Sequence, residues 1–194
     1  MTTDARKPRR TQEIFDATLE LVAERGYDAL AIEAVARRAG VNKSTIYRSW
    51  SSKDELLADA LTRSLALNLT IPDTGSFRGD LIEVAREIAR LLTEEPGRRL
   101  ATVMLGALPD RPATSQAVRA FFADRLDREQ VIFERARKRG ELATDVDPGS
   151  IMDLLGGALW FRVLIRSGSA EDSYLEALVD TVIYDVSHGS PNPR

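Results

Sequence analysis

Apolar residues recur at intervals of three and four along most of the chain, and this period constrains the fold more than any other feature. Ile14, Ala17, Leu21 and Val22, for example, fall on one face of a helix that Gly26 ends. A strand would require strict alternation instead. We find no convincing alternating segment. The sequence therefore predicts an all-α fold.

Residues that begin and end helices divide this pattern into about nine segments. Gly40 and Gly140 are suited to helix C-termini, where a positive φ is often required. Asn42 and Asp147 are expected N-caps, and Ser52 with Glu55 has the spacing of a capping box. The expected helices are residues 11–25, 32–39, 42–49, 52–68, 80–94, 98–108, 114–139, 148–168 and 169–187.

The segment TIPDTGSFRG, residues 70–79, is the clearest cluster of helix-breaking residues, and it predicts a domain boundary. The expected organisation has four parts. These are an N-terminal arm and helix-turn-helix domain (1–53, motif about 31–50), a connecting helix and linker (54–75), a regulatory and dimerisation domain (76–187) and a tail (188–194).

Charge is distributed unevenly between these parts. Ten of the 27 Lys and Arg residues lie in residues 1–53, against seven of the 30 Asp and Glu residues. A basic first quarter on an otherwise acidic chain indicates two tasks, although an excess of this size is also within ordinary scatter.

Composition excludes several classes of protein. The chain has no cysteine, its one histidine (His188) lies in the expected tail, and no metal-ligand spacing occurs. We therefore expect neither an enzyme nor a bound cofactor or metal. No run of about 18 apolar residues and no secretory signal is evident, which predicts a cytoplasmic protein without a membrane partner.

The stretch GVNKSTIYRSWSSKDELL, residues 40–57, combines a turn with a short polar helix. Val41, Ile46 and Trp50 are spaced to pack inward on the two preceding helices, as a helix-turn-helix requires. The outward side chains would then reach phosphates and base edges. The predicted DNA contacts are Asn42, Lys43, Ser44, Thr45, Tyr47, Arg48 and, at the start of the next helix, Lys53.

Residues 11–57 resemble the DNA-binding domain of TetR/AcrR-type bacterial transcriptional regulators. The resemblance rests on LVAERGYDAL (21–30) and VARRAGVNKSTIYRSWSSKDELL (35–57). It implies that Tyr47 and Lys53 meet backbone phosphates. Two residues depart from the family pattern: Ala31 stands where Thr or Ser often caps the second helix, and Trp50 stands where Phe is usual. Tyr27 is interpreted as a core residue in preference to a phosphate contact.

The four cations Arg6, Lys7, Arg9 and Arg10 have two interpretations. They form a flexible arm for the minor groove, or only a solvated N-terminus. The sequence does not decide between them.

Two late segments suggest a dimer interface. LLGGALWFRVLI, residues 154–165, is apolar nearly all round, so it needs cover on more than one side. Together with the last helix it predicts a four-helix interface between two copies, as the family resemblance also implies. The expected interface residues are Trp160, Leu175, Leu178, Val179, Val182 and Val186.

A ligand pocket is expected among the fifth to eighth helices, for an unidentified apolar or aromatic small molecule. Its candidate walls are Met104, Leu108, Phe121, Phe122 and Phe161, each of which plain core packing would also explain.

These features predict a homodimeric, ligand-responsive transcriptional repressor that binds a quasi-palindromic operator. An activator of the same architecture fits equally well. The alternatives are a helical dimerising adaptor that has lost ligand-controlled DNA binding, for which Ala31 leaves room, and a ligand carrier or enzyme.

Overall fold

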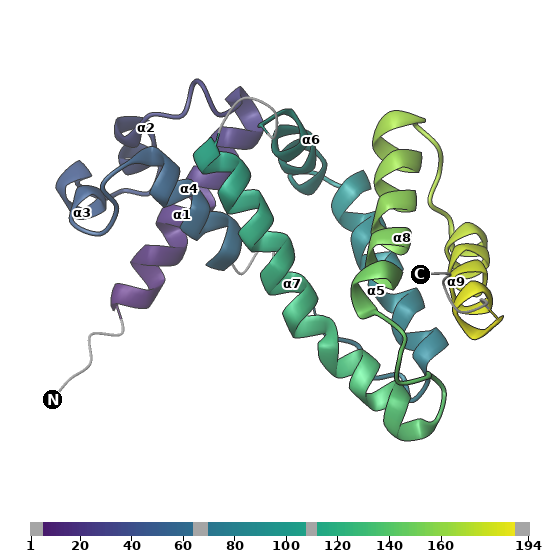
Figure 1. The fold of residues 1–194 in the computed structure, drawn as a ribbon. Coiled ribbons are helices and arrows are strands. Elements are labelled where there is room, and N and C mark those ends of the chain that lie inside the picture. Colours follow the sequence, from purple (N-terminus) through teal and green to yellow (C-terminus); the bar gives the residue numbers. More distant parts are fainter. Residues whose placement is uncertain (1–5, 64–69, 108–111, 189–194) are drawn as a thin grey trace, which may run out of the picture. The chain divides into compact units, whose positions relative to one another are not determined.

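The computed structural model describes residues 6–63, 70–107 and 112–188, and the regular secondary structure in these ranges is helical throughout (Figure 1). This confirms the predicted all-α fold. The chain divides into two compact units, Met1–Leu69 with Glu95–Asp124, and Thr70–Glu94 with Arg125–Arg194. The predicted ends of the fourth and sixth helices, at residues 68 and 108, and the tail after His188 lie outside the described residues.

The first unit is organised around its first helix. It contains α1 (Arg6–Arg25), α2 (Ile32–Arg38), α3 (Lys43–Tyr47), α4 (Lys53–Arg63), α6 (Gly97–Ala107) and the first part of α7 (Pro112–Arg139). Helix α1 contacts α2, α4 and α6. Phe15, Val22, Ile46 and Leu56 are buried in this unit's core, so the short α3 is supported by longer helices.

The second unit is organised around α5. It contains α5 (Phe77–Thr93), the rest of α7, α8 (Pro148–Trp160), the π-helix η2 (Phe161–Ile165) and α9 (Asp172–His188). Helix α5 contacts α8, η2 and α9. Phe77 meets Phe133 edge to face, with ring centroids 5.5 Å apart, and Leu81 and Ile151 of the same unit are also buried.

Four helix boundaries differ from the predictions by three residues or more, and one of them is the start of α9, at Asp172 and not at residue 169. Helix α1 begins at Arg6 and not at residue 11, because a proline such as Pro8 is tolerated in the first turn; Arg6–Arg10 are therefore helical and do not form an extended arm. Helix α5 begins at Phe77, because the Ser76 hydroxyl accepts the Gly79 N–H. Helix α8 ends at Trp160 and not at residue 168, and the π-helix η2 continues it from Phe161 to Ile165.

The predicted cap at Asp147 is confirmed. Its carboxylate accepts hydrogen bonds from the backbone N–H groups of Gly149 and Ser150, at 3.2 and 2.9 Å. Pro148 follows at the first helical position, where no N–H partner is needed. These hydrogen bonds, together with one from the Ser150 hydroxyl, lower the pKa of Asp147.

The prediction that no segment is long and apolar enough to cross a membrane is wrong on length and composition alone. The 18 residues Pro148–Ile165 have a mean hydropathy of 1.2. Asp153 and Arg162 interrupt this segment, and a single helix of this kind also occurs in soluble proteins that bury it in a core or an interface.

Candidate nucleic-acid interface

A sharp turn places α3 across the end of α2. Gly40 has φ of +63°, a left-handed conformation that glycine adopts without strain. The Val41 N–H returns to the carbonyl of Ala36 at 2.9 Å, which closes the C-terminus of α2. Two short helices joined by a tight glycine-containing turn are the geometry of a helix-turn-helix.

The inward side of α3 is fixed by an aliphatic and an aromatic residue. Ile46 is 0% exposed and Trp50, just beyond the helix, is 5% exposed. The Trp50 ring meets Phe15 of α1 edge to face at 5.7 Å, and its Nε1–H donates to Asp59 of α4 at 3.0 Å. Trp50 thus ties α3 to both long helices of its unit.

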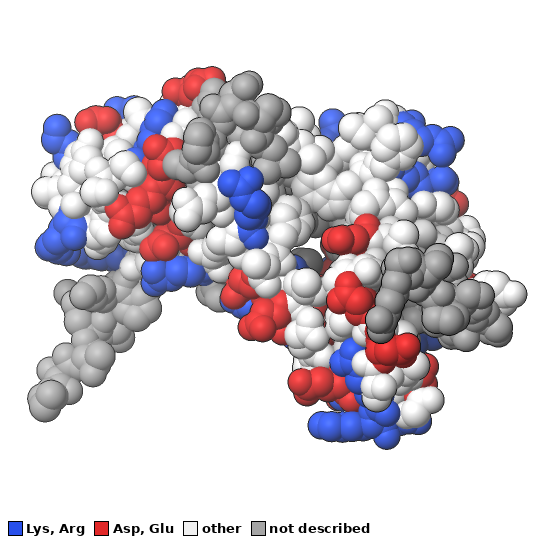
Figure 2. Space-filling model, viewed as in Figure 1, with Lys and Arg blue, Asp and Glu red and all other residues white. Residues whose placement is uncertain are grey.

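The outward side of α3 carries polar and charged side chains. Lys43, Ser44, Tyr47 and Arg48 are exposed, Tyr47 by 50%, and Thr45 is half-buried. Figure 2 shows blue basic side chains around the end of this unit, with red acidic side chains farther along the same unit. The surface offers cations, hydroxyls and an aromatic ring over a few ångströms of helix, which suits contacts to phosphates and base edges.

Two predicted caps near α3 and α4 differ in detail. Asn42 precedes α3 with an extended backbone but makes no side-chain cap hydrogen bond, so its predicted capping role is wrong and the amide is exposed. Ser52 accepts the Glu55 N–H as predicted, at 3.2 Å. The Glu55 carboxylate, however, accepts from the N–H and hydroxyl of Ser51 and not from Ser52, and these bonds lower its pKa.

Ala31 precedes α2 with an extended backbone and no side-chain cap hydrogen bond. The methyl side chain cannot accept an N–H, so this helix start lacks the hydroxyl that its position usually supplies.

Lys53, at the start of α4, lies against Tyr27 in the connection between α1 and α2. Its ammonium is 4.4 Å from the centroid of the Tyr27 ring and 3.4 Å from the Tyr27 carbonyl oxygen. The Tyr27 hydroxyl in turn donates to the carboxylate of Asp54. The sequence predicts a core residue at Tyr27, but Tyr27 is half-buried and is not among the buried residues of this unit.

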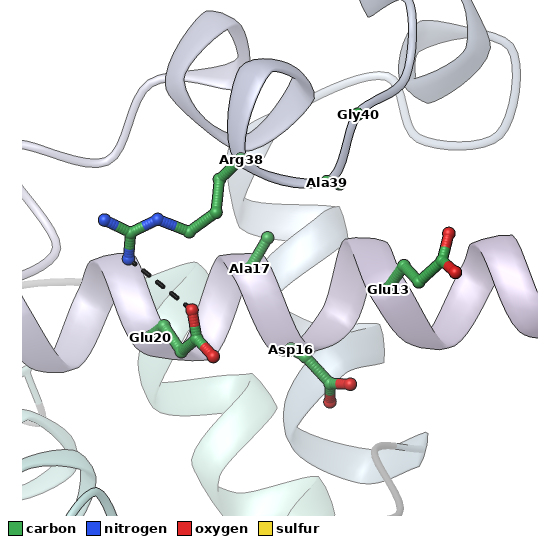
Figure 3. Close-up of a pocket in the computed structure, with 7 residues that line it drawn as sticks. All are labelled: Glu13, Asp16, Ala17, Glu20, Arg38, Ala39 and Gly40. Carbon is green, nitrogen blue, oxygen red and sulfur yellow. Dashed lines mark ion pairs between the residues drawn. The ribbon is translucent and has the colours of Figure 1, made fainter.

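Arg38, at the end of α2, is engaged by acidic residues of α1. Its guanidinium donates to both carboxylate oxygens of Glu24, at 2.7 and 2.8 Å, and lies 3.6 Å from Glu20. This pairing lowers the pKa of Glu24. Figure 3 shows Arg38 reaching towards Glu20 at one edge of an open depression of about 430 Å³, whose lining is completed by Glu13, Asp16, Ala17, Ala39 and Gly40. The depression is mainly acidic, so it is unsuited to DNA phosphates.

The predicted pocket residues have different environments. Met104 and Phe121 are buried in the first unit, where Phe121 packs edge to face on the 43% exposed Phe122. Phe161 lies in the second unit and is 56% exposed. Leu108 lies outside the described residues. Among the described residues, no group of three or more His, Cys, Asp or Glu side chains is arranged to hold a metal ion.

The predicted interface residues of α9 are mostly buried within their own unit. Leu175, Val179 and Val182 are almost inaccessible and lie on the face that α5 and α8 cover, whereas Leu178 and Trp160 are half-buried. Nothing is described of the Val186 side chain. Other large apolar side chains of this unit are exposed, and the all-round apolar pattern of residues 154–165 predicts some of them. They are Val131 on α7, Leu154 on α8, Phe161 and Ile165 on η2, and Tyr184 on α9.

Helix α3 follows α2 after a tight turn, buries its apolar face against its own unit and exposes polar side chains. This arrangement is typical of DNA-binding proteins of the helix-turn-helix class. Two family models match the chain: residues 14–60 match the bacterial regulatory proteins of the tetR family, and residues 71–182 match the tetracyclin repressor-like C-terminal domain. The chain belongs to the TetR family of transcriptional regulators.

Relatives match along most of the chain. The uncharacterized HTH-type transcriptional regulator YdeS of Bacillus subtilis is 33% identical over 167 residues, which are 86% of this chain and 84% of YdeS. The DNA-binding transcriptional repressor TetR of Mycobacteroides abscessus is 32% identical over 181 residues, 92% of this chain and 94% of that protein.

Solved structures share the fold. The TetR family transcription regulator SCO0332 superposes with a TM-score of 0.74 at 33% identity, over 90% of this chain and 96% of that one. FadR of Bacillus subtilis, solved in complex with stearoyl-CoA, gives a TM-score of 0.64 at 21% identity, over 92% and 98%. This chain is therefore a DNA-binding regulator with the all-α architecture of its family.

Proposed function

We propose that the protein is a homodimeric repressor that two α3 helices hold on a quasi-palindromic operator, and that a small apolar or aromatic molecule releases it. The observation that carries this proposal is the exposed polar face of α3, fixed from behind by Ile46 and Trp50. A relative of nearly the same length is named a transcriptional repressor, which supports the direction of regulation. The protein acts in the cytoplasm by binding, without catalysis.

The DNA contacts are assigned from the chemistry of the side chains, five of which are exposed while Thr45 and Lys53 are half-buried. Asn42, Lys43, Ser44 and Arg48 are exposed at the outer end of the unit, and Tyr47 presents its ring and hydroxyl beside them. Thr45 and Arg48 are assigned to base edges, since a hydroxyl and a guanidinium can both read them. Tyr47 and Lys53 are assigned to phosphates, which carry affinity without sequence preference.

The dimer surface is assigned to the exposed apolar side chains of the second unit. Leu154, Phe161 and Ile165 are spaced by seven and four residues, which keeps them on one face of α8 and η2. The exposed Gly157 on the same face would let a partner helix approach closely. A second copy of this chain that covers these residues with α8 and α9 would give the predicted four-helix interface. Leu175, Val179 and Val182 then support it from within.

The ligand proposal rests on the fold and on two buried residues. FadR has the same fold and was solved with stearoyl-CoA, so this architecture can hold an apolar molecule. Met104 and Phe121 are the buried members of the proposed wall. Release requires that the ligand binds the DNA-incompetent conformation more tightly, commonly by about 1–3 kcal/mol.

The proposal is tested by fluorescence anisotropy with the DNA upstream of the protein's own gene, at several salt concentrations. Specific, salt-sensitive binding is expected, and Lys53→Ala should weaken specific and non-specific DNA alike while reducing the salt slope by about two, one for each copy in the dimer. Arg63→Ala is the matched control, because Arg63 already pairs with Asp59 at 2.7 Å. Unchanged affinity and salt slope in Lys53→Ala would remove the phosphate role.

The uncapped Ala31 is the one observation that favours the adaptor alternative. An adaptor would form dimers and show no site-specific DNA binding, so the same titration with wild-type protein separates the two functions.

A further inference from the structure

The contact between Lys53 and Tyr27 joins residues that lie far apart in the sequence at the proposed phosphate site. The ammonium lies over the ring face at 4.4 Å, where the ring quadrupole attracts a cation. It also donates to the Tyr27 carbonyl oxygen at 3.4 Å. The ring and the backbone carbonyl of Tyr27 therefore both hold the ammonium end of the long, flexible Lys53 side chain.

Tyr27 is itself held from α4. Its hydroxyl donates to the Asp54 carboxylate, and Asp54 is the immediate neighbour of Lys53. The Tyr27 carbonyl also accepts the Leu30 N–H at 3.0 Å, which fixes the backbone of the connection between α1 and α2. Ring, carbonyl and hydroxyl thus have set positions relative to the first turn of α4.

We propose that Tyr27 is a positioning residue for DNA binding, which holds the Lys53 ammonium ready for an operator phosphate. This inference rests on the proposed phosphate contact of Lys53. An ammonium has three N–H donors, so one can meet the Tyr27 carbonyl while others face a phosphate. Ordering a free lysine on binding costs affinity, and a side chain ordered beforehand avoids that cost.

The resulting effect is a change in affinity without a change in the number of phosphate contacts. Tyr27→Met keeps an apolar side chain and the backbone carbonyl but removes the ring, so Lys53 loses one of its two contacts and is less ordered before DNA binds. We expect operator binding by the dimer to weaken roughly fourfold to hundredfold, since each of the two Lys53 side chains contributes a factor of about two to ten. The salt slope should stay near the wild-type value because Lys53 still reaches the phosphate.

The first experiment is an NMR measurement on the protein without DNA. Protons beside the Lys53 ammonium should be shifted upfield by the Tyr27 ring, with Lys53→Met used for assignment. Tyr27→Phe should retain the shift and Tyr27→Met should lose it. Exposed Lys43 is the matched reference. Lys53 shifts equal to those of Lys43 in wild-type protein would overturn the inference, whatever the variants do.

The second experiment is a double-mutant cycle on operator affinity. Tyr27→Met should weaken binding in the wild-type and Lys43→Met backgrounds by the same factor, and should have no further effect in Lys53→Met. Equal weakening in all three backgrounds would show that Tyr27 acts only through the fold, and no weakening in any would show that it does not act; either result overturns the inference. Wild-type protein that binds no specific DNA would overturn the proposed function, while the NMR shifts would still report the contact.

Discussion

Helix α3 and the α8–η2 segment expose opposite kinds of side chain. In α3 the apolar Ile46 is buried and the surface is polar, whereas α8 and η2 expose Leu154, Phe161 and Ile165. Both segments pack on neighbouring helices. Helix α3 contacts α2 and is followed by Trp50, which packs on Phe15 of α1, whereas α8 contacts α5 and α9. The difference indicates which partner each surface suits, because DNA requires charged and polar groups while a protein interface core is apolar.

Buried residues support both surfaces. Trp50 and Val179 both lie in cores, but Trp50 supports the surface proposed to bind DNA and Val179 the surface proposed to bind a second copy of the chain. A substitution in either core should affect stability first, whereas one on either surface should affect binding without changing stability.

The largest effect is expected in the support of α3. Trp50→Ala should lower the free energy of unfolding of the first unit by about 3–5 kcal/mol, because it leaves a cavity beside Phe15 and removes the partner of Asp59. Urea denaturation followed by circular dichroism measures this change. Tyr47→Ala, on the exposed side of the same helix, should stay within about 0.5 kcal/mol of wild type. Equal losses would mean that α3 has no distinct outer face.

The next effect is expected at the apolar surface of the second unit. Phe161→Glu places a charge in the proposed dimer interface and should weaken dimerisation by about 2 kcal/mol, or roughly thirtyfold, as measured by sedimentation equilibrium. Tyr47→Glu makes the same charge change at another exposed aromatic residue and should leave the oligomeric state unaltered. A Phe161→Glu protein that dimerises like wild type would rule out this surface.

A smaller effect is expected on the polar face of α3. Arg48→Ala should reduce discrimination between operator and scrambled DNA by about 1–3 kcal/mol if its guanidinium reads a base. Competition binding measures both affinities, and Lys53→Ala is the control that should weaken them equally. Parallel losses in Arg48→Ala would reassign Arg48 to the backbone.

The smallest effect is expected from a carboxyl group inside the second unit. Glu129 is 2% exposed, and burial raises its pKa above the usual 4.5 even though Arg125 lies 2.8 Å away and opposes the shift. The native state then keeps a proton that the unfolded chain has lost, so stability should fall as pH rises from about 4.5 through the raised pKa. Glu129→Gln should remove this fall, as measured by urea denaturation at a series of pH values.

Glu141 is the control of opposite sign. Pairing with Arg139 lowers its pKa, so its contribution is present above its usual pKa and is lost as pH falls through the lowered value. Glu141→Gln should therefore destabilise the protein at neutral pH and not in strong acid. A Glu129→Gln curve with the same shape would contradict the assignment of burial as the dominant cause.

Local signals predicted local structure well. Asp147 and Pro148 begin a helix because both act through their own backbone neighbours, and Gly40 ends one because only its own φ is at issue. Of the two caps that differ, Asn42 makes no side-chain hydrogen bond, and Glu55 has a choice between near-equal partners. Glu55 can reach Ser51 or Ser52, and sequence spacing does not distinguish two adjacent N–H groups.

The predictions that the structure changed depend on contacts between residues that lie far apart in the sequence. The apolar period of Leu175, Val179 and Val182 predicts burial, but it cannot say whether the covering helix belongs to the same chain or to a partner. The contact of Lys53 with Tyr27 depends on how α4 packs on α1. The exposed face of α3 was predictable because Ile46 is buried on one side of the short helix, which leaves the other side to the polar residues.

The pairing of Arg38 with Glu24 has a consequence for ion release. Salt dependence measures the counterions that a protein displaces from DNA, and not the formal charge of its sequence. A guanidinium already neutralised by two hydrogen bonds to one carboxylate displaces few of them. Arg38 should therefore add little to the salt dependence of DNA binding, and fewer than the ten Lys and Arg residues of residues 1–53 are available to displace counterions.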